Sequence, residues 1–576
     1  MTPQERTAWF AATAAAMVMA LAGYDASTFN SIQGFETFIN HFKEPGDDTI
    51  QPNILGGINT AYHVGAIVSG LLISPTISKK FGRKIPIQIG TSIVLISVMV
   101  QTFAPNIVCF IAGRVLMGLG KGISMNNGPT YIAEIAPAKI RGIMLSLWQL
   151  WYTIGAFIVY WAAYGAQRTT LDMGIWQWRI PLFVQIPIPV FIIVSIFFCP
   201  ESPRWLVEND RVEDARSALT RVRNDQIDEE VADIVTAVAY EKSTTKHWDK
   251  WWAPYWTLVR EPSLLRRTLV VIFINVGQQI SGSSSLNAYT TLIYKSVFKS
   301  TETIALINAL SGTCSIIFTL SCTLLVDRVG RRCILMVGAA GMCISLLVVA
   351  ILGMKVPESA DGTRPYGMGV AVAAMFFLFI FFYKPSWGAT VWVYTSEIFS
   401  TDVRAHGVAI GAQSQSVAST ILNQFFPTFL KNCGFYTFFF FVGVNALLLV
   451  GVFFFLPETK GVPLEEIDVL FGSVSHREKG EDVLEGKMKT DSLEGEPTIV
   501  HHNGFTSNFY NPYYHCSFLN DLPRVLIWKT VCIALKVVPP VEESMFDEFE
   551  VSAPVDIFFW GSLNHLIENH CPKALP

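Results

Sequence analysis

Long apolar stretches separated by short polar loops make up most of the chain. A helix crosses a bilayer core of about 30 Å with roughly 20 apolar residues. Windows of about this length lie at 8–30, 53–75, 85–104, 107–128, 143–165, 179–199, 268–293, 303–326, 332–353, 368–394, 405–429 and 434–456. The pattern predicts an all-α membrane protein with twelve transmembrane helices, with the lipid bilayer as its surroundings.

The composition agrees with this class and excludes others. The chain is 51% hydrophobic and 15% charged, whereas soluble domains carry about 25% charged residues. Its net charge is −4, and no basic field indicates nucleic acid as a partner. It has no nucleotide-binding glycine loop, no nucleophile motif and no His or Cys cluster with metal spacing. We therefore expect no enzyme, no metal site and no cofactor.

Polar segments divide the chain into five parts. Residues 1–199 and 268–456 each hold six apolar windows, which predicts an N-terminal and a C-terminal six-helix half. Residues 200–267 are polar with helical periodicity, so we expect a cytosolic linker with short helices. Residues 457–500 are hydrophilic and predict a cytosolic tail. Residues 501–576 are an atypical extension, either a disordered functional tail or an artefact of the gene model.

Basic residues in short loops predict the orientation. Residues 79–84, after the second window, and residues 327–332, after the eighth, are rich in Lys and Arg, whereas residues 43–48 are not. Cytoplasmic loops carry an excess of Lys and Arg. We expect the basic loops to face the cytoplasm, and twelve spans then place both termini there.

Three motifs recur in the two halves. Their first and second copies are separated by 248, 263 and 257 residues. The pairs are Gly82-Arg83-Lys84 with Gly330-Arg331-Arg332, Glu134-Ile135 and Arg141 with Glu397-Ile398 and Arg404, and Pro200-Glu201-Ser202 with Pro457-Glu458-Thr459. The repeat predicts two pseudo-symmetric halves, and transporters built in this way bind solute at the interface of the repeats.

Together with further motifs, these elements resemble the sugar porter family of the major facilitator superfamily over about residues 10–470. The further motifs are Gly23-Tyr24-Asp25, Ala112-Gly113-Arg114, Tyr131 to Pro137, Pro203-Arg204-Trp205-Leu206, Gln278 to Gly282, Asp327 to Arg332, and Val393 to Phe399. The resemblance implies the major facilitator fold, a sugar as the solute, a monomeric transporter and a plasma-membrane location.

Asp25 lies inside the first apolar window, and Arg114 lies inside the fourth. A charge at mid-membrane costs roughly 2.5–3.5 kcal/mol or more unless it faces a cavity or a partner. We interpret the two as neutralising each other, so that a change in their separation changes the proton occupancy of Asp25. The resemblance implies the same roles in proton coupling, with the proton gradient as the driving force. A purely structural ion pair is the alternative.

Charged motif residues near the basic loops form a candidate cytosolic gate. They are Arg83, Glu134 and Arg141 in the first half and Asp327, Arg331, Glu397 and Arg404 in the second. The resemblance implies that such networks hold the outward-facing state and break as the inner side opens. Positive charge that only sets topology is the alternative account. Lys79 replaces an acidic residue of the family, so the first-half network lacks one acidic member.

The seventh window is unusually polar for a span, with Gln278, Gln279, Ser284, Asn287 and Tyr289 among its residues. Neutral amides and hydroxyls bind sugar hydroxyls, and aromatic rings stack on sugar faces. The resemblance adds further positions that contact the sugar, so that the candidate substrate-binding residues are Gln149, Gln278, Gln279, Ser284, Asn287, Tyr289, Trp392 and Gln415. Hydrogen bonds between helices are the alternative role for these side chains.

The site also departs from the family pattern. Ser284, Ala288 and Ser416 replace an asparagine, a tyrosine and a tryptophan of the family. The lost bulk predicts a substrate larger than a free hexose, such as a disaccharide, or an atypical polyol. We expect a sugar importer, a hexose or disaccharide transporter that uses proton symport. A facilitative uniporter and a non-transporting nutrient sensor are the alternatives.

Overall fold

The apolar windows of the first half fold into long helices. The computed structural model describes residues 2–46, 48–169, 173–223, 227–244, 253–298, 300–356, 365–399, 403–460 and 471. The first half contains α1 (Pro3–Ile32), α2 (Glu36–Phe42), α3 (Pro52–Val68), η1 (Ser69–Ile73), α4 (Ser74–Phe81), α5 (Lys84–Thr102), α6 (Ile107–Ile135), α7 (Ala138–Arg168), α8 (Trp176–Phe183) and α9 (Pro187–Phe198). Thr2 and Glu5 form a capping box that starts α1, and the Asn106 side chain caps α6.

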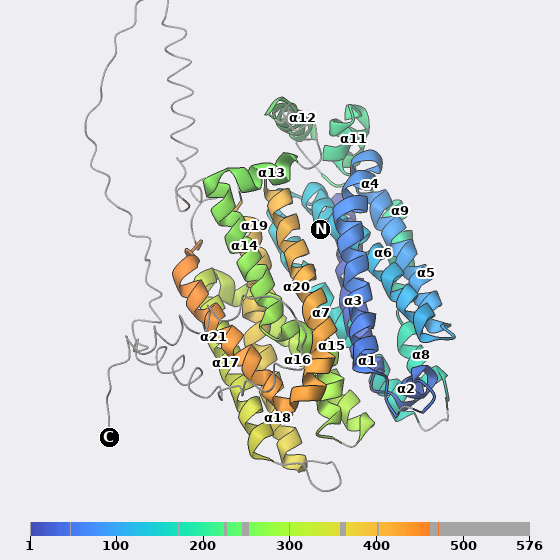
Figure 1. The fold of residues 1–576 in the computed structure, drawn as a ribbon. Helices are drawn as coiled ribbons and strands as arrows, with labels where there is room; N and C mark the ends of the chain where they lie inside the picture. Colours follow the sequence, from blue (N-terminus) through green and yellow to red (C-terminus); the bar gives the residue numbers. More distant parts are fainter. Residues whose placement is uncertain are drawn as a thin grey trace, which may run out of the picture. The chain divides into compact units, whose positions relative to one another are not determined.

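The polar linker and the second half follow. The linker holds α10 (Pro203–Glu208), α11 (Val212–Thr220), α12 (Ile227–Thr244) and α13 (Ala253–Arg260). The second half contains α14 (Pro262–Ile280), α15 (Ser283–Lys295), α16 (Thr301–Val329), α17 (Arg331–Lys355), α18 (Tyr366–Tyr383), η3 (Lys384–Gly388), α19 (Thr390–Glu397), α20 (Arg404–Cys433), η4 (Gly434–Tyr436) and α21 (Thr437–Phe455). Figure 1 shows the two groups of helices side by side, with α11, α12 and α13 at one end.

The helical fold class is confirmed, and the described residues contain helices without strands. Ten stretches of them are long and apolar enough to cross a membrane. One of the ten, His406–Phe455, includes both α20 and α21, whereas the 31-residue α7 is not among them. The full set of twelve spans therefore stays a prediction. The tail beyond residue 460 lies outside the described residues except for Phe471, and so does the whole 501–576 extension.

Several predicted spans are interrupted. The seventh window breaks at Gly282, whose φ of 103° lies in the left-handed region that suits glycine, so α14 ends and α15 begins there. The tenth window contains η3, a π-helical turn between α18 and α19. Irregular backbone at membrane depth is tolerated where it lines a cavity. Both interruptions therefore predict the position of the solute site.

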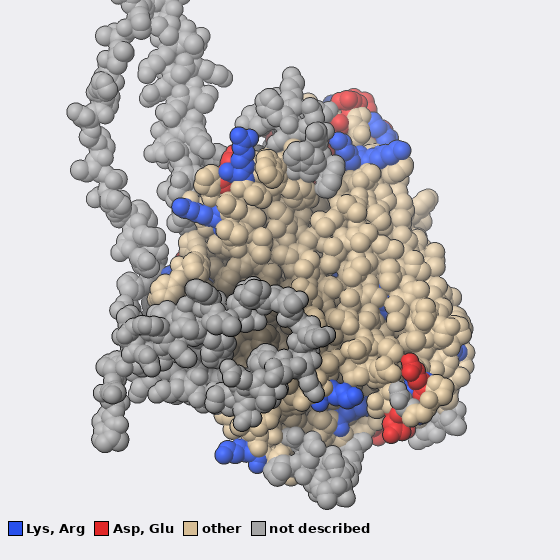
Figure 2. Space-filling model, in the orientation of Figure 1, with Lys and Arg blue, Asp and Glu red and all other residues tan. Residues whose placement is uncertain are grey.

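On the face that Figure 2 shows, charged side chains gather at the two ends of the bundle, and the surface between the ends carries few of them. Large apolar side chains of the long helices are exposed, as Phe197 of α9 at 70% and Phe454 of α21 at 73% illustrate. Lipid tails rather than water would solvate such a belt. The end that carries residues 82–84 and 330–332 is called the basic end below.

The two halves are joined by hydrogen bonds near the end opposite the basic end. The Gln33 side chain on the first half donates to the Ala288 carbonyl on the second at 2.7 Å, and Thr291 Oγ1 donates to the Asn30 carbonyl at 2.6 Å. Thr428 Oγ1 donates to Asn53 Oδ1 at 3.1 Å. The structure therefore represents a state that is closed at this end.

Candidate functional site

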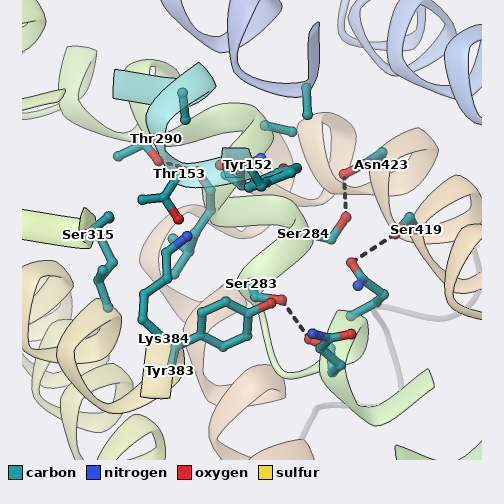
Figure 3. A pocket seen from close by; sticks show the side chains of 18 of the residues that line it. Tyr152, Thr153, Ser283, Ser284, Thr290, Ser315, Tyr383, Lys384, Ser419 and Asn423 are labelled. Carbon is teal, nitrogen blue, oxygen red and sulfur yellow. Dashed lines mark hydrogen bonds between the residues drawn. The ribbon is translucent and has the colours of Figure 1, made fainter. Parts of the chain in front are cut away.

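A cavity of about 220 Å³ lies between the two halves, next to the interrupted helices. Helices α1, α3, α6 and α7 of the first half and α14, α15, α16, α18, η3, α19 and α20 of the second line it. Its wall is a mixture of amides, hydroxyls and aromatic rings, as Figure 3 shows for part of it. Such a lining fits a small solute with many hydroxyl groups.

The cavity brings together most of the predicted substrate-binding residues. The ones that line it are Gln149, Gln278, Gln279, Ser284, Asn287, Trp392 and Gln415. Tyr289 does not line it, because its hydroxyl donates to the Asn423 carbonyl at 2.7 Å within α20 and to the Leu55 carbonyl at 3.4 Å in the other half. Tyr289 therefore joins the halves. Ala288 and Ser416, the positions of lost bulk, do line the cavity.

Hydrogen bonds near the break between α14 and α15 orient the amide side chains of the cavity, Gln278, Gln279 and Gln415, which are called the amide wall below. Gln278 Nε2 donates to the Trp387 carbonyl at 2.6 Å, so η3 holds this side chain, and Gln415 donates to Gln278 Oε1. Ser283 donates to the Gln278 carbonyl at 2.6 Å, and Ser419 donates to Gln279 Oε1 at 2.9 Å. The amides are thus fixed before a solute enters, which limits the entropy lost on binding.

Sequence reasoning missed several lining residues that carry charge or polarity inside apolar windows. They are Asn59, Tyr62, His63, Lys121, Tyr152, Thr153, Lys384 and Asn423. An ionisable residue within a predicted span indicates function by default. That signal, applied to Lys121, His63 and Lys384, would have found three of them.

Asp25 and Arg114 lie together, but their contact differs from the predicted ion pair. Arg114 Nη1 donates to the backbone carbonyl of Asp25 at 3.4 Å, and its Nη2 donates to Asn59 Oδ1 at 3.2 Å. No ion pair between the two side chains is among those the described residues form. The guanidinium also faces the Tyr62 ring at 4.8 Å, and that ring lines the cavity.

The Asp25 carboxylate instead accepts a hydrogen bond from Gln185, between α8 and α9. Its second oxygen, Oδ2, is buried without a hydrogen-bond partner among the described residues. Sequence reasoning missed Gln185, although a glutamine within the sixth apolar window was a visible signal. The site therefore holds a carboxylate with one free oxygen beside the positively charged wall of the cavity.

At the basic end, the same set of contacts occurs in both halves. Arg83 pairs with Glu134 at 3.1 Å, and Arg331 pairs with Glu397 at 2.9 Å. Ser202 donates to Glu134, and Thr459 donates to Glu397. All these contacts lie within a half, so they brace each half and do not join the two halves in this state.

A second repeated contact caps two helices. Glu201 accepts hydrogen bonds from the Arg83 and Lys84 backbone amides at the start of α5. Glu458 accepts from the Arg331 and Arg332 amides at the start of α17. A carboxylate at a helix N-terminus satisfies free N–H groups and interacts favourably with the helix dipole. The residues of the repeated sequence motifs therefore make the same contacts in both halves.

The surroundings of Glu201 and Arg83 shift the pKa values of these two side chains. Burial raises the pKa of the Glu201 carboxyl, and the backbone amides oppose that effect. Burial lowers the pKa of Arg83, but Glu134 and its neighbours raise it more, so the net change is upward. Arg83 therefore stays charged at physiological pH. The side chains of Arg141, Asp327 and Arg404, the other predicted gate residues, lie outside the described residues.

Fold and cavity together define a polytopic membrane transporter with two similar halves. The chain belongs to the sugar porter family of the major facilitator superfamily, because the family model described as "Sugar (and other) transporter" matches residues 11–471. This family consists of transporters and not of enzymes.

Named relatives and solved structures agree with the family. A protein of Aspergillus fumigatus named "Probable quinate permease" is 30% identical over 91% of this chain and 98% of its own. A "High-affinity glucose transporter" of Kluyveromyces lactis is 30% identical over 78% of this chain and 82% of its own. The chain has the fold of the xylose transporter XylE from E. coli, in a partially occluded inward-open conformation, with a TM-score of 0.66 and 22% identity over 80% of this chain and 100% of the other.

Proposed function

We propose that the protein imports a sugar or a related polyhydroxylated solute by proton symport. The observation that carries the proposal is the buried Asp25 carboxylate. Its Oδ2 has no hydrogen-bond partner among the described residues, and Asp25 lies beside Arg114, which lines the cavity. A buried unpaired oxygen is costly, and a proton on that oxygen removes the charge. In this proposal, the protonation site at Asp25 is adjacent to the solute-binding cavity, because Arg114 contacts Asp25 and lines the cavity.

Alternating access would connect the two. In the state described here the halves are joined near the end opposite the basic end. Opening of these contacts exposes the cavity to the outside, where Asp25 takes up a proton and the amide wall binds the solute. Closure then returns the bundle to the present state, and release follows at the basic end, which faces the cytoplasm in the predicted orientation.

Replacement of Asp25 by Asn tests the coupling. We expect the variant to lose uphill accumulation driven by a pH gradient, because it has no titratable carboxylate, while it still exchanges solute across the membrane. Accumulation and counterflow are measured in proteoliposomes, with Asp48→Asn as a control at an exposed position. Undiminished accumulation in D25N overturns the proposed coupling.

Two other functions remain as alternatives. A facilitative uniporter has the same fold, and wild-type protein that equilibrates solute without alkalinising the medium would identify it. In a non-transporting sensor, deletion of the residues after about 475 would abolish signalling, whereas in a transporter the same deletion would leave uptake intact.

The remaining elements of the proposal follow from the family. We place the protein in the plasma membrane as a monomer, with both termini cytoplasmic, and with the proton gradient in place of any cofactor. The substrate panel should include D-glucose, D-xylose, a disaccharide, myo-inositol and quinate, because the relatives are named for different solutes.

A further inference from the structure

The charge of the cavity wall does not match a neutral sugar. Arg114, Lys121 and Lys384 line the cavity, and none of the described residues that line it is acidic. Asp25 lies behind the wall near Arg114, which leaves the two lysines as additional positive charge. Neutral sugars need hydrogen-bonding groups and have no use for uncompensated cations in a low-dielectric span.

Among the charged residues that line the cavity, Lys384 is the strongest candidate to bind a ligand, because of its position. It begins η3, in the interior of the membrane stretch Tyr366–Glu397. No ion pair formed by the described residues includes it. Its Nζ lies 5.7 Å from the centre of the Tyr152 ring, on the opposite half of the protein. In Figure 3 the side chain extends from its helix toward Tyr152 and Thr153.

The positive charge of Lys121, unlike that of Lys384, lies on the same side of the cavity as Asp25, and it is also close to the electron-rich face of an aromatic ring. Its Nζ lies 4.5 Å from the centre of the Tyr62 ring, which the Arg114 guanidinium also faces at 4.8 Å. Lys121 and Arg114 thus lie on the side of the cavity where Asp25 is. Lys384 belongs to the other half and has no described acid near it, so a bound anion is its natural counter-charge.

The surroundings of Lys384 define the kind of anion. Thr153, Ser315 and Tyr383 line the same part of the cavity and are neutral. A single ammonium group with neutral hydroxyls and amides around it suits one carboxylate on a polyhydroxylated body. A phosphate, in contrast, is commonly held by arginine forks or several backbone amides.

We propose that the solute is a polyhydroxylated monocarboxylate and that Lys384 binds its carboxylate group. This inference rests on the proposed transport function and names its substrate class. Binding of the anion to Lys384 of the second half, while Gln149 and Tyr152 of the first half contact the hydroxyl-bearing body, would draw the halves together around the solute.

The charge moved per cycle follows from the proposal. One proton carries +1 and one carboxylate carries −1, so a cycle with one of each moves no net charge. The same cycle with a neutral sugar moves one positive charge. Wild-type transport of the acid should therefore be driven by a pH gradient and be independent of membrane potential.

Matched pairs of probes test the inference in proteoliposomes. The first pair is D-glucuronate with D-glucose, which differ in the carboxylate at C6. The second pair is quinate with myo-inositol, two polyhydroxylated cyclohexanes of which only quinate carries a carboxylate, although quinate also has fewer hydroxyl groups. In wild-type protein we expect one acid to be transported with a lower KM than its neutral partner, without a transport current. In K384Q the KM for that acid should rise at least about 10-fold, and K384R should restore most of it. K431Q removes the same charge at an exposed position outside the cavity and should behave as wild type.

The outcomes separate the two proposals. Proton-coupled, electrogenic uptake of a neutral sugar in preference to its acid overturns the carboxylate inference and leaves the symport proposal standing. An unchanged KM for the acid in K384Q overturns the role of Lys384. Uptake of a probe without any dependence on the pH gradient overturns the symport proposal itself. Should K384Q fail to fold, the currents and KM values of the wild-type protein still decide the substrate class.

Discussion

At the scale of single residues, the hydrogen bonds of Asp25 determine how its charge is held inside the bundle. Gln185 donates to one carboxylate oxygen, and the other oxygen has no described partner. Arg114 contacts the backbone of the same residue and not its carboxylate. The carboxylate is therefore held in place by a neutral amide, and a proton can be added to it without first breaking an ion pair.

Replacement of Gln185 by Leu should impair coupling more than solute binding. The change removes the only described donor to the buried carboxylate, and a hydrogen bond to a charged group contributes about 1.5–3 kcal/mol. We expect a lower accumulation ratio at a fixed pH gradient, with counterflow retained. Q88L is a matched control, since Gln88 also bridges two helices of the same half but donates to the Ile193 carbonyl at 3.4 Å. Equal accumulation by Q185L and Q88L would contradict this role.

The residues of the site were predictable to the extent that motif and polarity mark them. Gln149, Gln279 and Trp392 were found in this way and line the cavity. Tyr289 was selected because it lies in a polar span, but its backbone departs from helical geometry at φ −133°, and its hydroxyl points to α20. A local kink cannot be seen in a hydropathy pattern, so the direction of this side chain could not be predicted.

At the scale of elements, the repeated contacts at the basic end explain why the sequence repeats three short motifs. Each glycine of the Gly-Arg loops has a positive φ, 88° at Gly82 and 98° at Gly330. That turn aims the following backbone amides at Glu201 in one half and Glu458 in the other. Tyr131 and Tyr394 complete the pattern by donating to the Pro200 and Pro457 carbonyls. The two halves thus use one capping arrangement twice.

Replacement of Glu201 or Glu458 by Gln should destabilise the protein by similar amounts. Each change replaces a charged acceptor of helix-start amides by a neutral one, and we expect a loss of about 1–3 kcal/mol. Thermal unfolding in detergent measures the effect, with E213Q as the control because Glu213 is exposed at the start of α11. If E201Q and E458Q unfold at the same temperature as E213Q, the caps do not contribute to stability.

The order of helices along the chain was predictable because apolar length is a strong signal, whereas the backbone geometry of their interruptions was not. The 368–394 window contains Pro385, Ser386 and Gly388 directly after Lys384, and η3 divides the window at these residues. Similarly, α8 ends at Phe183 and α9 begins at Pro187 within the sixth window. Pro187 and Pro385 mark these positions in the sequence. The π-helical form of η3 also depends on packing, such as the bond from the Trp387 indole to the Leu335 carbonyl at 2.9 Å, and a hydropathy pattern does not contain that information.

At the scale of the whole molecule, transport requires the contacts opposite the basic end to open and close. Gly56 of α3 lies against the α20 backbone there, and a Cβ at this position would come within 2.6 Å of the Gln424 carbonyl oxygen. The neighbouring Gly57 has nothing within 4 Å of such an atom. The closed state therefore depends on the absence of a side chain at Gly56 and not at Gly57.

A tryptophan at Gly56 should hold the halves apart and stop the cycle, because its side chain cannot fit between α3 and the α20 backbone. We expect G56W to lose net transport while its cavity still binds solute from the side opposite the basic end. G57W is the matched control and should transport normally, since its side chain enters open space. A cysteine introduced at Asn287 in the cavity reports the state, and an impermeant thiol reagent applied from that side should label it faster in G56W than in G57W. Equal labelling combined with normal transport by G56W would show that closure at this contact is not a step of the cycle.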